Sequence, residues 1–142
     1  DLVGRKLTMH QGRLLQNLQK EIQDFINLNK DNEDLKDFMS PLENSFQEVT
    51  ASTMWLMQNG LKDPENALAS ASDYLNLLAL TSMTYMWARM AKFSIGKNEP
   101  IHKNKIKTGK YFMEKVMPEL FMYSKKVQAG KSSMMDMEVA EF

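Results

Sequence analysis

The residues from Ala67 to Ile95 form a stretch that is apolar on more than one side of a helix. The stretch is long enough for about eight helical turns of 3.6 residues each. One apolar stripe contains Leu68, Ala71, Leu75, Leu78 and Tyr85, and another contains Leu77, Leu80, Met83, Trp87 and Met90. A helix that faces water on one side needs only a single stripe of roughly 100°. We therefore expect this stretch to be the central helix of an all-α domain, contacted from several directions.

Length and composition are typical of one globular domain. The chain has 142 residues, of which 43% are hydrophobic and 25% are charged, and a chain of this length buries roughly 70% of its unfolded surface. Its 18 basic and 18 acidic residues balance, so we expect no nucleic-acid partner. There is no cysteine for a disulfide or a thiol nucleophile. Without a signal peptide or a membrane-spanning run, we expect a soluble, cytoplasmic protein.

Two amphipathic helices are predicted before the central stretch. Residues 9–29 carry apolar side chains at spacings of three and four, namely Leu15, Leu18, Ile22, Phe25 and Ile26. Residues 33–59 repeat this spacing with Leu35, Phe38, Leu42, Phe46, Val49, Thr53 and Leu56. Gly60 stands where a left-handed C-cap is expected. Pro41 leaves two alternatives open: the helix starts at Ser40 after a short separate turn, or it begins near Asp34 and bends at Pro41.

The central helix is predicted to span residues 64–95, because Asp63-Pro64-Glu65 combines an acidic cap, a proline at the first position and an acid in the first turn. A last helix is predicted over residues 102–129, followed by Gly130 as its C-cap. Its inner side contains Ile106, Gly109, Phe112 or Met113, Val116, Leu120, Tyr123 and Val127. Pro118 removes a backbone hydrogen bond inside this helix, and we predict a kink there rather than two helices.

Four helices with short connections predict an antiparallel up-and-down four-helix bundle over residues 9–130. Residues 131–142 form a C-terminal tail with three methionines and a terminal phenylalanine, which we expect to dock through apolar contacts. The chain begins at Asp1 in D-L-V-G-R-K-L, without an initiating methionine. We interpret residues 1–8 as the end of a preceding element and expect the chain to be a fragment of a longer polypeptide.

Motifs for catalysis or metal binding are sparse. Glu99 and His102 have the E-x-x-H spacing of di-iron bundles, but such sites need two of these motifs and two further glutamates. The motif here lies beside Pro100 in a predicted loop. His10 has no partner at a metal-binding spacing, and the common nucleotide-binding and hydrolase signatures are missing. From the residues alone we predict no catalytic, cofactor-binding or metal-binding residue.

Charge is distributed unevenly along the chain. Residues 21–65 hold ten acidic and three basic residues, whereas residues 89–131 hold eleven basic and three acidic ones. A basic cluster opens the last predicted helix and contains Lys97, Lys103, Lys105, Lys107 and Lys110. We interpret this cluster mainly as a solvated face. The alternative is a contact with an acidic partner surface or with a phosphate-bearing ligand such as coenzyme A.

Two charged residues of the central helix have both a structural and a functional interpretation. Asp73 either bonds to Ser70 or a basic residue such as Lys125 or Lys126, or acts as a catalytic base. Arg89 either anchors a neighbouring helix through its apolar stem or binds a substrate. We favour the structural interpretation for both. The 13 methionines are similarly interpreted as adaptable core filler rather than as a partner-binding surface.

Four blocks of the sequence together indicate a family. They are D-L-V-G-R-K-L at residues 1–7, A-S-D-Y-L at 71–75, M-W-A-R-M-A at 86–91, and K-V-M-P-E at 115–119, which is followed by A-G at 129–130. In this order they resemble the C-terminal region of the large acyl-CoA dehydrogenases, and most of all the bacterial group that includes 3-methylmercaptopropionyl-CoA dehydrogenase. The resemblance runs over the whole chain. Met117 and the lysine-rich last helix depart from the family pattern in surface and packing only.

The resemblance implies that residues 1–8 close the last helix of a dehydrogenase core. The FAD site, the acyl-CoA pocket and the catalytic glutamate would lie upstream, so no catalytic residue is carried over to this chain. In the parent enzyme, a glutamate would take the α proton of an acyl thioester and hydride would pass from the β carbon to the flavin. An electron-transfer flavoprotein would accept the electrons.

The chain itself would then be an inactive helical bundle without FAD, which supports the core and contributes to subunit contacts in a homo-oligomer. Part of the second apolar face of residues 67–95 would serve these contacts. The alternative is a free-standing helical interaction module without enzymatic activity. The gene upstream of Asp1 distinguishes the two, because only the first requires a dehydrogenase core in the same reading frame.

Overall fold

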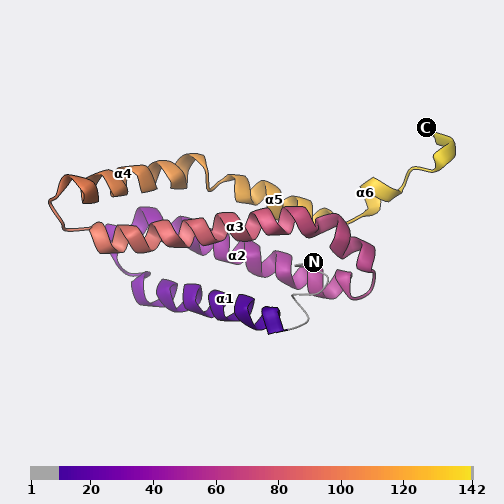
Figure 1. Cartoon of the computed structure of the whole chain (residues 1–142), viewed down its shortest axis with the longest axis horizontal. Helices are drawn as coiled ribbons and strands as arrows, with labels where there is room; N and C mark the ends of the chain where they lie inside the picture. Colours follow the sequence, from indigo (N-terminus) through magenta and orange to yellow (C-terminus); the bar gives the residue numbers. More distant parts are fainter. Residues whose placement is uncertain (1–9, 142) are drawn as a thin grey trace.

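Helices are the only regular secondary structure in the part of the chain that the structure describes. The structure is a computed structural model that describes residues 10–141 (Figure 1). Its elements are α1 (His10–Asn29), a 3-10 helix (Glu33–Leu35), α2 (Lys36–Gly60), α3 (Pro64–Ser94), α4 (Pro100–Lys115), α5 (Glu119–Ala129), α6 (Ser132–Met135) and a second 3-10 helix (Val139–Glu141). No strand occurs among these residues, so the all-α prediction is confirmed. The prediction for residues 1–8 lies outside the described residues.

The longer helices lie side by side along the long axis of the molecule (Figure 1). In this view α1 forms one edge, α2 and α3 lie in the middle, and α4 followed by α5 forms the other edge. The central helix α3 packs against α2, α4 and α5, whereas α1 packs mainly against α2. The chain from α6 onward extends away from the other helices. Among the described helices, none is both long enough and apolar enough to cross a membrane.

The last predicted helix is divided at Pro118, so the prediction of one kinked helix over residues 102–129 is wrong. Proline has no amide proton, and its ring would collide with the carbonyl group of Glu114, four residues earlier. The backbone responds with a short turn between α4 and α5. In this turn the amide of Met117 donates to the carbonyl of Phe112 at 2.9 Å. The described part of the chain therefore has five longer helices rather than four.

Pro41 is tolerated inside α2, which runs from Lys36 to Gly60 without a break. A helix start at Ser40 is therefore excluded, and the start lies close to the second alternative, just after the 3-10 turn. Because Pro41 is near the helix N-terminus, the loss of its amide proton leaves only the carbonyl of Asp37 without a helical partner.

The two predicted glycine caps differ in outcome. Gly130 is the C-cap of α5, as predicted, and has a positive φ of +69°, but its ψ of −157° lies outside the left-handed helical region. Gly60 lies within the last turn of α2 and is not among the glycines with positive φ, so the cap predicted there is wrong. A Cβ atom on Gly60 would lie 3.2 Å from the Cβ of Ala67. Glycine is favoured at this position because α3 approaches closely.

The hydrophobic core lies where α2, α3 and α5 meet. Its most deeply buried apolar side chains are Leu35, Phe38, Leu42, Tyr74, Leu77, Leu120 and Val127. Ile22 and Ile26 of α1 are also buried, as their spacing predicts. Burial of one such large apolar side chain contributes about 1.5–3 kcal/mol. Because these side chains pack on one another, the domain has a core of its own.

The C-terminal tail leaves its apolar side chains in solvent. Met134, Met135 and Met137 are each more than half exposed, and Val139 is almost fully exposed. These side chains do not dock onto the described part of this chain. Their docking onto another protein surface stays a prediction.

The contact of α4 with α2 and α3 depends on the missing side chain of Gly109. A Cβ atom there would lie 2.7 Å from Cε1 of Phe38 and 3.1 Å from Cε3 of Trp87. We expect Gly109→Ala to lower the free energy of unfolding by about 1–3 kcal/mol through overpacking, although alanine is the better helix former by about 1 kcal/mol. Urea unfolding measures the difference. Thr108→Ala, at an exposed neighbour, is the control and should stay within about 0.5 kcal/mol; a Gly109→Ala chain of wild-type stability would contradict the prediction.

Candidate functional site: the outer side of the central helix

The central helix begins as its sequence predicts. The backbone of Asp63 is extended, and its carboxylate accepts a hydrogen bond from the amide of Glu65 at 3.1 Å, with Pro64 at the first helical position. Lys131, which follows α5, lies 2.5 Å from the Asp63 carboxylate and 2.6 Å from that of Glu65. The hydrogen bond from Lys131 holds the pKa of the Asp63 carboxyl below its usual value of 3.8. These ion pairs join the end of α5 to the start of α3.

The inner side of α3 is built largely from small and hydrogen-bonding residues. Its buried residues are Ala67, Ser70, Tyr74, Leu77, Thr81, Thr84, Tyr85, Ala88, Ala91 and Ser94. The hydroxyl of Ser70 donates to the carbonyl of Val127 in α5 at 2.8 Å, and the hydroxyl of Tyr74 lies 2.7 Å from that of Thr53 in α2. Burial raises the pKa of Tyr74. Small side chains on this side allow α2 and α5 to approach the backbone of α3 closely.

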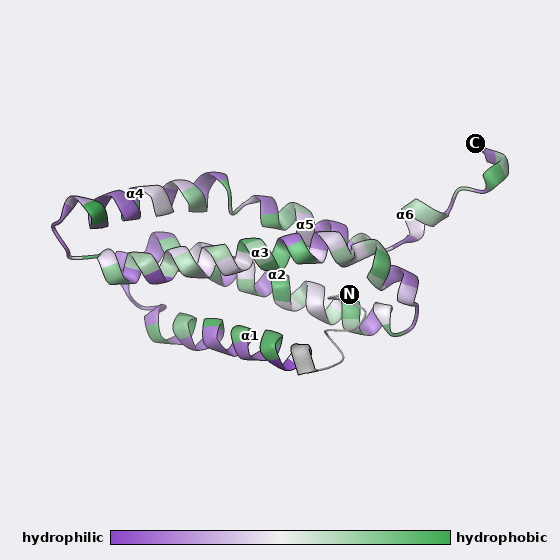
Figure 2. Cartoon of the chain, in the orientation of Figure 1, coloured by the Kyte–Doolittle hydropathy of each residue, from purple (hydrophilic) through white to green (hydrophobic). Residues whose placement is uncertain are grey.

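The outer side of α3 carries large apolar side chains that face solvent. The exposed residues are Leu68 (71%), Leu75 (57%), Met83 (46%), Met86 (49%) and Phe93 (66%), and Figure 2 shows that apolar residues recur along the whole of α3. We call these five residues the outer stripe. The helices α2, α4 and α5 pack against α3, as expected for a central helix contacted from several directions. The exposed residues come from both predicted apolar stripes, Leu68 and Leu75 from the first and Met83 from the second. Because α2 and α5 pack closely against α3, only the side of α3 with small residues fits against them. The large apolar side chains of the outer stripe therefore face solvent.

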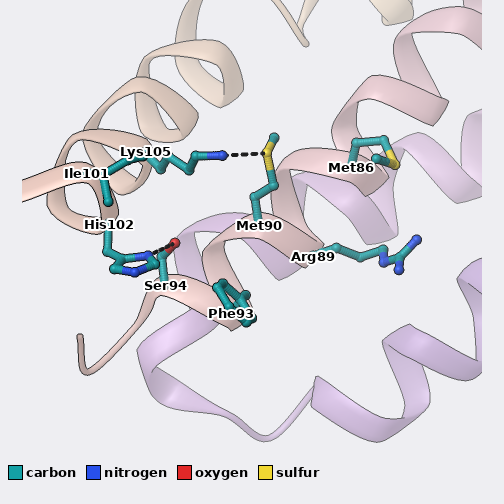
Figure 3. A pocket seen from close by; sticks show the side chains of 8 residues that line it. All are labelled: Met86, Arg89, Met90, Phe93, Ser94, Ile101, His102 and Lys105. Carbon is teal, nitrogen blue, oxygen red and sulfur yellow. Dashed lines mark hydrogen bonds between the residues drawn. The ribbon is translucent and has the colours of Figure 1, made fainter. Parts of the chain in front are cut away.

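A hollow lies between the C-terminal half of α3 and the start of α4 (Figure 3). Its volume is about 500 Å³, and its lining consists of Met86, Arg89, Met90, Phe93, Ser94, Ile101, His102 and Lys105. The turn before α4 contains Gly96, whose φ of +83° favours glycine. Nδ1 of His102 lies 3.1 Å from the hydroxyl of Ser94, and Nζ of Lys105 lies 3.8 Å from the sulfur of Met90. The lining thus combines apolar side chains with three basic ones.

The structure separates the five lysines of the predicted basic cluster. Lys105 lines the hollow, and Nζ of Lys97 lies 3.1 Å above the ring of Phe93. Lys110 forms an ion pair with Asp37 of α2 at 3.4 Å. Lys103 and Lys107 are exposed and form no ion pair within residues 10–141. Of the five lysines, only Lys105 and Lys97 therefore contribute charge near the hollow.

Arg89 connects α3 to α1. A guanidinium nitrogen lies 3.9 Å from Oε1 of Glu21, and the guanidinium carbon lies 5.5 Å from the centre of the Tyr85 ring. The Tyr85 hydroxyl donates to the same Glu21 oxygen at 2.9 Å. Burial, together with the bond to Glu21, raises the pKa of Tyr85. These contacts support the structural interpretation of Arg89.

Asp73 is half-buried and forms no hydrogen bond or ion pair with the residues that the structure describes. Its predicted bond from Ser70 is not formed, because the Ser70 hydroxyl donates to Val127 instead. The predicted pairing with Lys125 or Lys126 is also absent within this part of the chain. No contact indicates a catalytic role for the carboxylate.

Glu99 and His102 lie at the start of α4 rather than in a loop. Glu99 is the residue that caps the helix, and His102 faces Ser94. Within residues 10–141, no group of three or more histidine, aspartate or glutamate side chains could hold a metal ion. His10 is the first residue of α1.

A buried polar cluster between α2 and α5 was not predicted. The Ser52 and Ser124 hydroxyls lie 3.0 Å apart, and Ser124 donates to Oε2 of Glu48 at 2.5 Å while Nε2 of Gln128 donates to Ser124 at 3.2 Å. A signal for it does exist in the sequence. Ser52 falls at helical spacing between the buried Val49 and Leu56, so a serine lies in an otherwise apolar row. The cluster satisfies buried hydroxyl groups and holds α2 to α5.

The described part of the chain is an all-helical domain, and comparison with known protein families shows to which family it belongs. The family model described as "Acetyl-CoA dehydrogenase C-terminal like" matches residues 18–138. The chain therefore belongs to this family of C-terminal domains of acyl-CoA dehydrogenases, which confirms the resemblance at the level of the family. No curated protein matches the chain.

The family uses FAD, so the fit of a flavin to the hollow can be tested. Dinucleotides are usually held by a glycine-rich turn whose amides contact the diphosphate at a helix N-terminus. The hollow lies at the N-terminus of α4, but that helix opens with Pro100, which has no amide proton. The lining contains no glycine-rich turn and consists of thioether, aliphatic and phenyl groups with Ser94 and three basic side chains. These residues do not fit FAD.

The ion pairs of Lys131 generate a prediction about pH. A carboxyl whose folded-state pKa is depressed adds stability above its unfolded-state pKa, and this stability is lost as pH falls through the folded-state pKa. Because the Asp63 pKa lies below 3.8, Lys131→Met should lower the melting temperature most at neutral pH. The melting curves of variant and wild type should converge as pH falls below the aspartate range. Lys62→Met, at an exposed neighbouring position, is the control and should show no such convergence; a constant difference for Lys131→Met at all acidic pH values would exclude the ion pairs as its source.

Proposed function

We propose that this chain is the non-catalytic C-terminal domain of an FAD-dependent acyl-CoA dehydrogenase. The family match over residues 18–138 is the observation that supports the proposal. In the proposed parent, an upstream core holds the flavin and carries out the α,β-dehydrogenation of acyl-CoA thioesters. An electron-transfer flavoprotein accepts the electrons. The sequence blocks at residues 71–75 and 86–91 favour a parent of the large bacterial group that includes 3-methylmercaptopropionyl-CoA dehydrogenase.

We further propose that the domain supports this core through the part of the outer stripe that does not line the hollow, namely Leu68, Leu75 and Met83. Exposed apolar side chains that are scattered singly are normal, whereas a contiguous row marks a contact surface. Leu68, Leu75 and Met83 form such a row at helical spacing, and no charged residue occurs between Asp73 and Arg89. An apolar contact contributes about 25 cal/mol for each Å² removed from water. The exposed methionines of the tail offer a second contact, with the core or with another subunit of a homo-oligomer.

The proposal that the upstream core, and not this chain, holds the flavin can be tested by measuring flavin content. We expect the 142-residue chain, purified alone, to show no visible flavin absorbance, because the proposed flavin site lies in the upstream core. The polypeptide that includes the upstream reading frame should be yellow and should reduce an artificial electron acceptor when an acyl-CoA is added. A yellow preparation of the isolated chain would overturn the proposal. A reading frame that starts immediately before Asp1 would instead favour a free-standing interaction module.

The contact of the outer stripe with the core generates a second prediction. The double variant Leu75→Gln/Met83→Gln replaces side chains that are exposed in this domain, so each change should alter the stability of the isolated chain by no more than about 0.5 kcal/mol. In the polypeptide with the core, the same pair should lower the melting temperature, because both amides would be buried in an apolar contact. Leu28→Gln, at an exposed position on α1, is the matched control. Equal melting temperatures of the double variant and the wild-type parent would exclude this stripe as the contact.

A further inference from the structure

We propose that the hollow between α3 and α4 binds a small anionic amphiphile, that is, a single alkyl chain that carries a carboxylate or phosphate head. The proposal concerns residues of this chain alone. It does not depend on whether a dehydrogenase core is attached. Three features of the hollow support it, and each is visible in Figure 3.

The first feature is the apolar wall. Met86, Met90 and Phe93 of α3 line the hollow together with Ile101 of α4. Three of the four side chains are largely exposed, and Met90 is half-buried. Methionine side chains are flexible and polarisable, so they adapt to an alkyl chain that has no fixed shape. A volume of about 500 Å³ is within the range of roughly 300–1,000 Å³ that small-molecule pockets occupy.

The second feature is the positive charge at the hollow. The ammonium group of Lys105 reaches across to the sulfur of Met90 at 3.8 Å (Figure 3), and a thioether is a weak acceptor. Arg89 forms a partly exposed ion pair with Glu21 of α1 at 3.9 Å, which is too long for a hydrogen bond. No aspartate or glutamate is part of the lining. An anionic head would provide Lys105 with the oxygen acceptor that it lacks and would add a second anionic partner for Arg89.

The third feature is the fixed position of His102. Its Nδ1 contacts the hydroxyl of Ser94, which is fully buried, so the ring is held at the wall and Nε2 remains for another partner. The hollow also adjoins the N-terminus of α4, where the helix dipole favours negative charge. Lys97 adds a further positive charge above the ring of Phe93. The charges near the hollow are therefore predominantly positive.

The apolar wall predicts the alkyl part of the ligand, and the basic side chains predict its anionic head. A simple inorganic anion would leave the methionine and phenylalanine wall in water, and a neutral alkane would leave Lys105 without an oxygen acceptor. An alkyl chain with one anionic head satisfies both at once. Carboxylate and phosphate heads share this chemistry, and the experiment separates them.

The experiment titrates the isotope-labelled 142-residue chain with decanoate, decyl phosphate and decanol, each below the concentration at which it aggregates. Amide NMR spectra report the site, and calorimetry reports the affinity. We expect one saturable site whose shifted signals belong to the end of α3 and the start of α4. Either anion should bind more tightly than decanol, and added salt should weaken the binding of the anions only, because salt screens exposed charges. The stronger of the two anions identifies the head group.

Variants test the role of the individual side chains. Lys105→Gln should weaken decanoate binding about three- to tenfold, as expected for one partly exposed charge-assisted hydrogen bond. Phe93→Glu, at an exposed wall position, should abolish binding of the anions because it places a carboxylate at the hollow. Lys107→Gln, which removes an exposed lysine of the same helix that does not line the hollow, is the matched control and should bind as the wild type does.

Three outcomes would overturn the proposal. The first is equal affinity for decanol and decanoate, which would mean that apolar surface alone binds. The second is a set of shifted signals in α1, α2 or the tail rather than at the hollow. The third is the absence of monomer binding together with sedimentation on vesicles that contain phosphatidylglycerol, which would assign the charges to a membrane surface. Circular dichroism of each variant verifies the fold, and Lys105→Gln provides the decisive comparison if Phe93→Glu is unstable.

Discussion

The close approach of α3 to α2 and α5 is the constraint on which the rest of this structure depends. It is possible because the inner side of α3 carries residues such as Ser70, Thr84 and Ala88, which are small enough for neighbouring backbones to come near. Hydroxyl groups at this interface need partners, and Ser70 finds one in the carbonyl of Val127. The Lys131 ion pairs then hold α5 against the start of α3. The glycine at position 60 follows from the same closeness, since α3 passes within contact distance of it.

A consequence of this packing is that large apolar side chains point outward. A leucine at the inner positions would separate the helices, and a protein interior tolerates little extra volume. Leu68, Leu75 and Met83 are therefore exposed in the described part of the chain, and their burial against another apolar surface would be favourable. The exposed apolar surface that we propose for contact with a partner and the closely packed interior therefore have the same cause. The inner side of α3 carries small residues, and its outer side carries large apolar ones.

Much of this fold could be predicted from local signals, because a helix start such as Asp63-Pro64 or a cap such as Gly130 depends on a few neighbouring residues. The orientation of α3 could not, since both of its sides have helical spacing and hydropathy alone favours the leucines inside. The break at Pro118 likewise depends on how the backbone around Met117 finds other hydrogen bonds. The hollow could not be predicted from the sequence for a different reason. Residues 89–94 and 101–105 lie side by side only in the folded chain, where Gly96 is part of the turn between α3 and α4. In the sequence, nothing distinguishes Lys105 from the other four lysines of the basic cluster.

The two parts of the outer side of α3 differ in charge, which favours different binding partners for each. From Leu75 to Met83 the helix has no charged residue, and an apolar row of this kind suits the complementary apolar surface of a folded partner. From Arg89 onward the helix adds Lys92, and Lys97 and Lys105 lie nearby. Here an apolar protein surface would have to desolvate several cations without acceptors, which is costly. A ligand with its own negative charge avoids this cost, so we propose that the basic end of the helix stays accessible to a ligand and that its uncharged middle contacts the partner.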